Sequence, residues 1–374
     1  MTTTNGSLQD GINRHILTVL PELNRVDGVE CAVCIVNSEG ELANGLKDQG
    51  VKVYSFDAPH GHHWRAFVGF YRAVRDFKPD LMHDAVTCFA ERIVARLFFP
   101  QLRWVSTYHG VRCAAGVAPV RNLMKRLMNR LLHLEFLRVF YVSQNCMEVD
   151  EGFGLYSSAI RRLGVNPINF KAIEKCQGKL RGMLGLDSDV PLVGTACRIA
   201  QIKRPDLFTE VMVRVLKENA QAHAVIMGEG PLLPMVKEMI DKSGVGNRFH
   251  LLGYRRDVVE LDADLDVFVM TSELEGMPTS VVEAISLDVP VAIMKVPGGL
   301  TDIARLNAAK GPFAVVAEHG DVTTMVRGIL KVLGDHALRN EYARKARAVC
   351  AVEYDVHRAV DQFIVGYREA LGGI

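Results

Sequence analysis

Short apolar, β-branched runs alternate with amphipathic stretches along nearly the whole chain. This alternation is typical of parallel α/β layers, because each strand is followed by a helix that returns over the sheet. In the first half, strands are expected at 30–36, 51–56, 80–84, 103–109 and 138–143. In the second half, they are expected at 191–197, 222–228, 248–253, 265–271, 289–294 and 313–317. The fold class is therefore α/β.

The chain is long enough for two domains, since its 374 residues exceed the usual size of one core. The stretch 167–189 contains no strand pattern, and a second set of β/α units follows it. We therefore expect one domain at 1–167 and a second at 168–354. Ligands of such sheets bind beyond the carboxyl ends of the strands, so the residues after each strand are the candidates for a site.

The composition excludes several classes of protein. Hydrophobic residues make up 49% and charged residues 23% of the chain, and the net charge of +1 gives no reason to expect nucleic acid as a partner. No apolar run reaches the roughly 18 residues that cross a bilayer, and the N-terminus lacks the pattern of a secretory signal. Cys31 and Cys34 are expected to be buried thiols of one strand, which fits a cytoplasmic protein.

Two glutamates follow the expected strand 265–271, in the segment SELEGMPTSVVEAISLDVP. Glu275 falls in a loop, a helix is expected to start at Thr279 or Ser280, and Glu283 falls in its first turn. Carboxylates and the amides of a helix start suit a sugar or an anion, because they bind hydroxyls and negative charge. The same residues also fit a capping box, in which Glu283 bonds back to the helix start and has a structural role only.

Two cations follow the strand 191–197, in CRIAQIKRPDLF. Arg198 and Lys203 lie in the loop, and Pro205 is expected in the first turn of the next helix. Cations beside a helix start suit a diphosphate, whose charge grows when its bond to a sugar breaks. A solvated basic loop is the alternative.

The segment ELEGMPTSVVEAISLDVPV resembles the paired-glutamate motif of the retaining glycosyltransferases of family 4, which have the GT-B fold. That fold consists of two Rossmann-like domains that face each other across a cleft, with a C-terminal helix, here at about 355–374, that packs back on the first domain. The resemblance implies that Glu275 orients the donor sugar, that Glu283 binds the ribose, and that Arg198 and Lys203 hold the diphosphate. It assigns the following loop to the donor as well: Gly276, Met277, Pro278 and Thr279.

Three further turns are similar to those of the family and follow the same order. Gly228 and Gly230 resemble a turn near the nucleoside, and Tyr254 and Arg255 resemble a loop near the base. The segment VPGGLTDI at 296–303 resembles the family's glycine pair near the end of the fold.

The first domain carries fewer such signals. Gly11 begins GINRHILTVLPELN, which is similar to the family's first helix start, and His109 follows a strand where the family often has a histidine that faces the sugar. The residues MTTT before Gly11 form a poor strand. Three explanations stay open: a short first strand, an upstream start codon, or a degenerate donor-facing loop.

Two apparent metal motifs are interpreted as structural. The histidines at 60, 62 and 63 have no acidic or cysteine partner nearby, and zinc needs more ligands. Asp262 and Asp264 precede a strand, where GT-B proteins have a structural aspartate. By resemblance, the enzyme needs no metal and no cofactor besides its nucleotide-sugar substrate.

A basic amphipathic helix is expected at 120–137, with leucines and methionines on one face and arginines and lysines on the other. Such a helix either packs on the sheet or lies on an anionic membrane surface. The second interpretation predicts peripheral attachment at the inner face of the membrane.

The resemblance implies retaining transfer of a sugar from a nucleoside diphosphate sugar to an acceptor hydroxyl, in the synthesis of a cell-surface glycan, a lipopolysaccharide or a glycolipid. Two rivals stay open: a sugar-nucleotide 2-epimerase of the same fold, and a glycosyltransferase-like binding protein without catalysis. The residues do not identify the base, the sugar or the acceptor.

Overall fold

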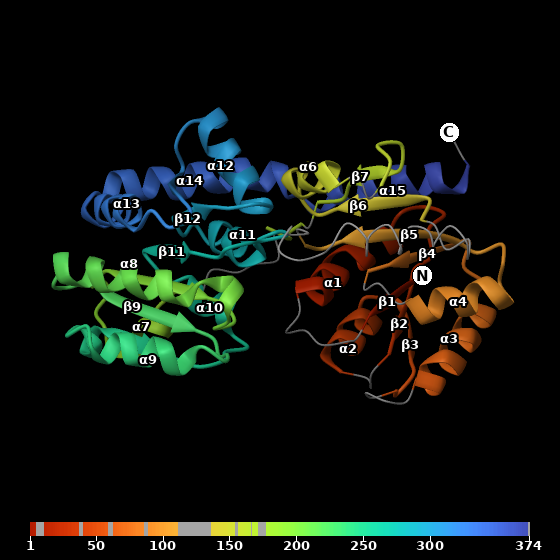
Figure 1. Ribbon diagram of the computed structural model, residues 1–374, viewed down its shortest axis with the longest axis horizontal. Helices are drawn as coiled ribbons and strands as arrows, with labels where there is room; N and C mark the ends of the chain where they lie inside the picture. Colours follow the sequence, from red (N-terminus) through yellow and green to blue (C-terminus); the bar gives the residue numbers. More distant parts are fainter. Residues whose placement is uncertain are drawn as a thin grey trace. The chain divides into compact units, whose positions relative to one another are not determined.

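The computed structural model describes residues 1–4, 11–36, 40–58, 63–85, 89–110, 136–153, 156–165, 167–170 and 177–372. The chain forms two compact units (Figure 1). The first comprises Met1–Pro167 and Val356–Ile374, and the second comprises Ile168–Asp355. Residues 120–135 of the expected helix 120–137 and the histidines at 60 and 62 lie outside the described residues, as does the side chain at 63.

The first unit is built on a parallel sheet in the order β3-β2-β1-β4-β5-β6-β7. Its strands are β1 (Thr2–Thr4), β2 (Ala32–Ile35), β3 (Lys52–Ser55), β4 (Leu81–Asp84), β5 (Arg103–Tyr108), β6 (Arg138–Tyr141) and β7 (Arg161–Leu163). Its described helices are α1 (Gly11–Asn24), α2 (Glu41–Asp48), α3 (His63–Phe77), α4 (Phe89–Phe98), α6 (Gln144–Phe153) and α15 (Val356–Leu371). The core joins α1, α2 and α15 to the sheet through residues such as Ile16, Leu42 and Phe363.

The N-terminal threonines form a short first strand, β1, between β2 and β4, which is one of the explanations that the sequence left open. Thr2 pairs with both Val33 and His83. Threonine is β-branched and suits a strand, but three polar residues leave no apolar pattern for the sequence to display. The strand is thus fixed by neighbours on both of its sides.

The second unit contains a parallel sheet in the order β10-β9-β8-β11-β12-β13. Its strands are β8 (Leu192–Ala196), β9 (His223–Met227), β10 (Phe249–Leu251), β11 (Val267–Met270), β12 (Val291–Lys295) and β13 (Ala314–Glu318). Its helices are α7 (Lys179–Leu184), α8 (Pro205–Glu218), α9 (Leu233–Asp241), α10 (Val258–Asp262), α11 (Thr279–Ser286), α12 (Gly299–Lys310), α13 (Val322–Gly334) and α14 (His336–Glu353), with 3-10 turns η1 (Gln201–Lys203) and η2 (Gly246–Arg248).

The core of the second unit lies between its sheet and the helices α8 and α13, which contact each other (Figure 1). Val193 and Val267 of the sheet, Val211 of α8 and Met325 of α13 are fully buried in it. These positions follow the alternation of a two-faced buried strand and the 3.6-residue period of an amphipathic helix. A packed sheet of this kind holds the loops at its edge in fixed positions.

The strand order determines where a site can form. The order in which strands are added to the parallel sheet reverses between β8 and β11 in the second unit. The strands β9 and β10 extend to one side of β8, whereas β12 and β13 extend to the other side of β11. The loops after β8 and β11 therefore diverge and leave a crevice at their carboxyl ends, the usual place for a ligand in an open parallel sheet.

Two distinct helices form the C-terminal part of the chain. The helix α14 ends at Glu353, and α15 begins at Val356, so Tyr354 and Asp355 lie between two distinct helices. The helix α15 contacts α1, β5, β6 and β7 and belongs to the first unit.

Candidate functional site

The loops that follow β8 and β11 are hydrogen-bonded to each other at the crevice of the second sheet. Glu273 N donates to the carbonyl of Ile202 at 2.8 Å. The hydroxyl of Thr271 donates to the carbonyl of Arg204 at 3.1 Å. These bonds bring the basic loop and the glutamate loop of the sequence together.

An ion pair occupies the point where the two loops meet. Lys203 Nζ donates to Glu275 Oε1 at 2.5 Å, and the two side chains are 24% and 10% exposed. Ser272 Oγ donates to the same oxygen at 2.6 Å. Within the described residues Glu275 Oε2 accepts no hydrogen bond. One carboxylate oxygen is therefore fixed by the protein, and the other remains able to accept from a ligand hydroxyl.

Glycines hold the backbone of the Glu275 loop close to the next loop. Glu275 N donates to Pro297 O, and Gly299 N donates to the carbonyls of Glu275 and Gly276. A Cβ on Gly299 would lie 2.6 Å from Pro278 Cδ. The family resemblance indicates only that the 298–299 glycine pair lies near the end of the fold. In the structure, the backbone of this pair is hydrogen-bonded to the glutamate loop.

Arg198 is exposed in the loop after β8, and its guanidinium has no partner among the described residues. Lys203 lies at the end of η1, and α8 begins at Pro205 as the sequence indicates. Arg204 is paired with Asp206, as Lys203 is with Glu275. The pairing with Asp206 raises the pKa of Arg204. Among the described residues of this loop, Arg198 is therefore the cation that can turn toward an anion, whereas Lys203 is held beside Glu275.

Gly228 and Gly230 are required by the packing of the turn after β9. A Cβ on Gly228 would lie 1.9 Å from the carbonyl oxygen of Cys197, and one on Gly230 would lie 2.3 Å from that of Ile199. Both glycines also have positive φ, 156° and 158°. Only glycine permits this approach of the β9 turn to the β8 loop.

The start of α11 corrects the capping-box interpretation. The helix begins at Thr279, its N-cap is Pro278, and no side chain caps it. Glu283 is 7% exposed and is the fifth residue of the helix, so it lies in the second turn instead of the first. Met277 is buried in the preceding loop. Ser280 and Glu283 therefore do not form a capping box at this helix start.

Tyr254 and Arg255 lie in the loop after β10. The Tyr254 side chain is 48% exposed. Arg255 donates two hydrogen bonds to Asp257, at 2.9 and 2.8 Å, and Lys179 also contacts that carboxylate. These two cations hold the pKa of Asp257 well below its usual range, with Arg255 as the larger cause. A role for the Arg255 side chain toward a base would require this pairing to open.

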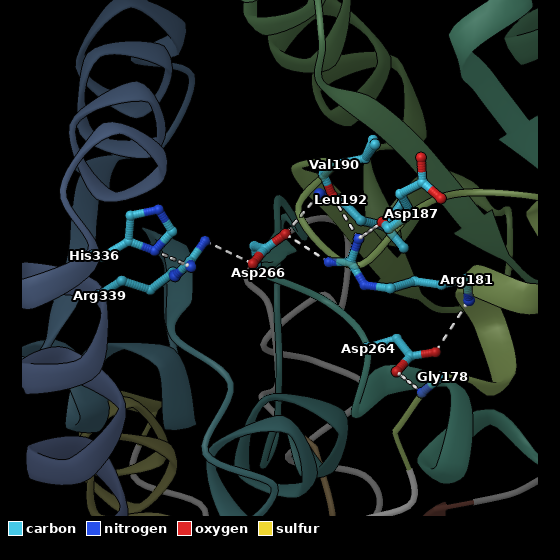
Figure 2. A network of polar contacts seen from close by, with 9 residues as sticks. All are labelled: Gly178, Arg181, Asp187, Val190, Leu192, Asp264, Asp266, His336 and Arg339. Atoms are coloured by element: carbon cyan, nitrogen blue, oxygen red, sulfur yellow. Dashed lines mark hydrogen bonds and ion pairs between the residues drawn. The ribbon is translucent and has the colours of Figure 1, made fainter.

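The aspartates before β11 have structural partners (Figure 2). Asp264 accepts backbone hydrogen bonds from Leu180 and Arg181, at 2.7 and 3.0 Å, and thereby caps α7. Asp266 accepts from Arg181 at 2.8 Å and from Arg339 at 2.6 Å. Asp264 thus joins α7 to the segment before β11, and Asp266 joins both α7 and α14 to it. Across the described residues, no group of three histidine, cysteine or acidic side chains could hold a metal ion.

His109 and Gly11 belong to the first unit. Gly11 begins α1, as the sequence indicates. His109 follows β5, and its Nε2 is buried without a hydrogen-bond partner in the described part of the chain. Burial holds the pKa of His109 well below its ordinary value, and His15 and His83 add to that effect. The imidazole is therefore neutral at pH 7.

Two family models match successive parts of the chain. "Glycosyltransferase Family 4" matches residues 9–163, and "Glycosyl transferases group 1" matches residues 177–349, so that together they cover most of both units. The chain belongs to the GT-B glycosyltransferases of the family 4 type.

The individual relatives of this chain are distant. The poly(ribitol-phosphate) alpha-N-acetylglucosaminyltransferase of Staphylococcus aureus is 26% identical over 173 residues, 46% of this chain and 34% of that protein. The alpha-D-kanosaminyltransferase of Streptomyces kanamyceticus is 25% identical over 276 residues, 73% of this chain and 65% of that protein. Matches to the first of the curated relatives thus span about a third to a half of their length.

Solved structures share the fold. The crystal structure of Anabaena HepE in complex with UDP and glucose superimposes with a TM-score of 0.80 at 17% identity, covering 98% of each chain. Among the described residues of this chain, no helix is both long and apolar enough to cross a membrane.

Proposed function

We propose that the protein transfers a sugar from a nucleoside diphosphate sugar to an acceptor hydroxyl with retention of configuration. The observation that carries the proposal is the Lys203–Glu275 ion pair at the strand-order reversal, with Arg198 exposed in the same loop. It supplies two cations for a diphosphate and a carboxylate oxygen for a sugar hydroxyl. HepE, which shares the fold, is described in complex with UDP and glucose.

In the proposed reaction, the bond between the anomeric carbon and the phosphate oxygen breaks, and a bond from that carbon to the acceptor oxygen forms. Arg198 and Lys203 stabilise the negative charge that grows on the departing diphosphate. Glu275 orients the sugar through Oε2, and Glu283 binds the ribose hydroxyls. The acceptor proton passes to the leaving phosphate, so the transfer needs neither a protein nucleophile nor a metal ion.

Nucleotide release tests this proposal. The purified chain is incubated with a panel of nucleoside diphosphate sugars, with and without glycolipid extract as acceptor, in the presence of EDTA. Release of nucleoside diphosphate that depends on the acceptor is expected for one donor. Conversion of the nucleotide sugar without any acceptor would instead indicate an epimerase, and absence of turnover with every donor and extract would contradict the proposal.

Site variants connect the activity to these residues. Arg198→Ala and Glu275→Gln are each expected to lower kcat about 100-fold or more, because each removes a group that acts on the transition state or aligns the sugar. Arg214→Ala is the matched control, since Arg214 pairs with Glu210 on the exposed face of α8. If Arg198→Ala retained the turnover of Arg214→Ala, the assignment of the site would be wrong.

Attachment to a membrane is a separate part of the proposal. It depends on the basic amphipathic sequence 120–137, of which residues 120–135 lie outside the described residues. Co-sedimentation with vesicles that contain anionic lipid tests it, and equal co-sedimentation with neutral vesicles would contradict it.

A further inference from the structure

A cavity of about 550 Å³ lies inside the first unit, between one face of the sheet and the helices α1 and α15. Its volume falls in the range of small-molecule sites, which is about 300–1,000 Å³. Apolar side chains of the two helices line one side of it: Ile16, Val19, Leu20, Leu23, Phe363, Ile364 and Leu371. None of its lining residues belongs to the loops proposed to bind the donor.

The cavity extends along the strands instead of ending at one edge of the sheet. Its lining reaches from Leu81, at the start of β4, to Ala85, just after that strand. Four residues of a strand span about 13 Å, so an occupant of the whole cavity is elongated. Exposed charged residues lie at the end where β2 and β4 begin: Asp27, Glu30, Lys78 and Asp80. The opposite end reaches His109.

Three hydrogen-bonded residues of the lining are polar but uncharged. His83 is hydrogen-bonded to the hydroxyl of Tyr367 and to that of Thr107, each at 2.6 Å. Burial lowers the pKa of His83 to about 3 and raises that of Tyr367 well above its ordinary value, so both groups are neutral at pH 7. A charged group placed against His83 and Tyr367 would lose its hydration without gaining an opposite charge.

His109 leaves one hydrogen-bonding position open at the inner end. Its ring lies edge-on to His15, with centroids 5.1 Å apart. Its Nε2 is buried and has no partner among the described residues, although it borders the cavity. A buried polar atom in this state carries a desolvation cost, which a ligand hydroxyl or amide can offset.

We propose that this cavity binds an uncharged, elongated and mainly apolar molecule whose single hydrogen-bonding group reaches Nε2 of His109. The apolar walls and the length of the cavity select the body of the ligand. The uncharged His83 and Tyr367, together with the unpartnered Nε2 of His109, favour a ligand whose polar end is uncharged. All of its lining comes from the first unit, whereas the loops proposed to bind the donor come from the second; His109 is the lining residue that the family resemblance also relates to the sugar.

A fluorescence titration tests the proposal on the full chain. The probe is N-phenyl-1-naphthylamine, an uncharged dye that brightens in apolar surroundings. Saturable binding is expected, with displacement by 1-octanol and at least about tenfold weaker displacement by octanoate or octylammonium, because the ions must be desolvated. UDP should not displace the dye. Absence of saturable binding, or equal displacement by octanol and octanoate, would overturn the proposal.

Two cavity-filling variants from opposite walls locate the binding. Ile364→Phe on α15 and Val19→Phe on α1 are each expected to weaken dye binding about tenfold or more, because an occupied cavity excludes the probe. The matched controls are Val365→Phe and Thr18→Phe, which alter neighbouring residues outside the lining. Because the two variants lie on opposite walls, either of them still tests the proposal if the other folds poorly. Equal dye affinity in fillers and controls would place the dye elsewhere.

A third variant tests the polar end. The chain should bind 1-octanol about tenfold more tightly than 1-fluorooctane, since the hydroxyl satisfies His109 Nε2 and the fluorine does so poorly. His109→Phe should abolish this preference while dye binding persists. A preference that survives in His109→Phe would show that His109 is not the polar contact.

Discussion

The two sheets have the same strand order at their centres, yet the residues beside the order reversal differ in kind. In the second unit, the reversal between β8 and β11 gathers charged groups, with the Lys203–Glu275 pair between the loops. In the first unit, neutral imidazoles line a cavity between the sheet and the helices α1 and α15. One topology therefore supports both an ionic and an uncharged site, and the side chains after or along the strands decide which.

The largest effect on stability is expected where the ionic site is broken. Lys203→Met should lower the free energy of unfolding of the second unit by about 2–4 kcal/mol, because Glu275 is left buried without its cation. This expected loss lies at the lower end of the range for breaking a buried ion pair, because about a quarter of the Lys203 side chain is exposed. Denaturation followed by circular dichroism measures it.

The control and a double variant sharpen this result. Lys242→Met removes an exposed pair with Glu238 and should cost less than about 1 kcal/mol. Lys203→Met combined with Glu275→Leu should recover part of the loss, because no uncompensated charge remains. A double variant less stable than Lys203→Met alone would show that the pair stabilises the fold beyond neutralising Glu275.

Lowering the pH below 7 should reduce the stability of the first unit, because its cavity is lined by buried neutral histidines. Burial holds the folded pKa of His83 at about 3, whereas an unfolded histidine titrates near 6.5. Because the folded pKa is lowered, the stabilisation is complete above about pH 6.5 and is lost progressively as the pH falls toward 3. Each such histidine contributes a loss of up to about 1.4 kcal/mol per pH unit in this window, and His109 acts in the same direction.

Tryptophan fluorescence isolates this acid effect, since both tryptophans, Trp64 and Trp104, belong to the first unit. Urea unfolding at pH 7 and pH 5 should show a lower midpoint at pH 5. The His223–His250 pair of the second unit also has lowered pKa values, but it is only partly buried and should contribute less. A tryptophan transition that did not change between pH 7 and 5 would contradict the neutral burial of His83 and His109.

The sequence predicts most of this architecture because its strands are apolar and its helices amphipathic. All eleven expected strands occur. The structure adds β1 and β7, which the pattern does not reveal: β1 is three threonines and β7 begins with two arginines. Edge strands such as β7 tolerate charge, and β1 forms only because two neighbours supply its hydrogen bonds. Strands of this kind depend on tertiary pairing instead of local preference.

The candidate site was predictable to the extent that it follows strand ends. The motif residues Lys203 and Glu275 could be named, but their mutual ion pair could not, since it depends on the crossing of two loops. Ser272, which fixes Glu275, gives no signal beyond its place after a strand. The pairing of His83 with Tyr367 joins residues 284 positions apart, so nothing local in the sequence indicates it.

The smallest effect is expected from a neutral hydrogen bond of the cavity. Tyr367→Phe removes the bond to His83 Nδ1 and should lower the stability of the first unit by about 1 kcal/mol, measured as the urea midpoint of tryptophan fluorescence. The cost stays small because no charge is exposed and the adjoining cavity can admit water to the imidazole. Tyr342→Phe on α14 of the second unit is the control and should leave that transition unchanged. A loss as large as that of Lys203→Met would mean that the neutral site is as tightly coupled as the ionic one, and the contrast between the two units would fail.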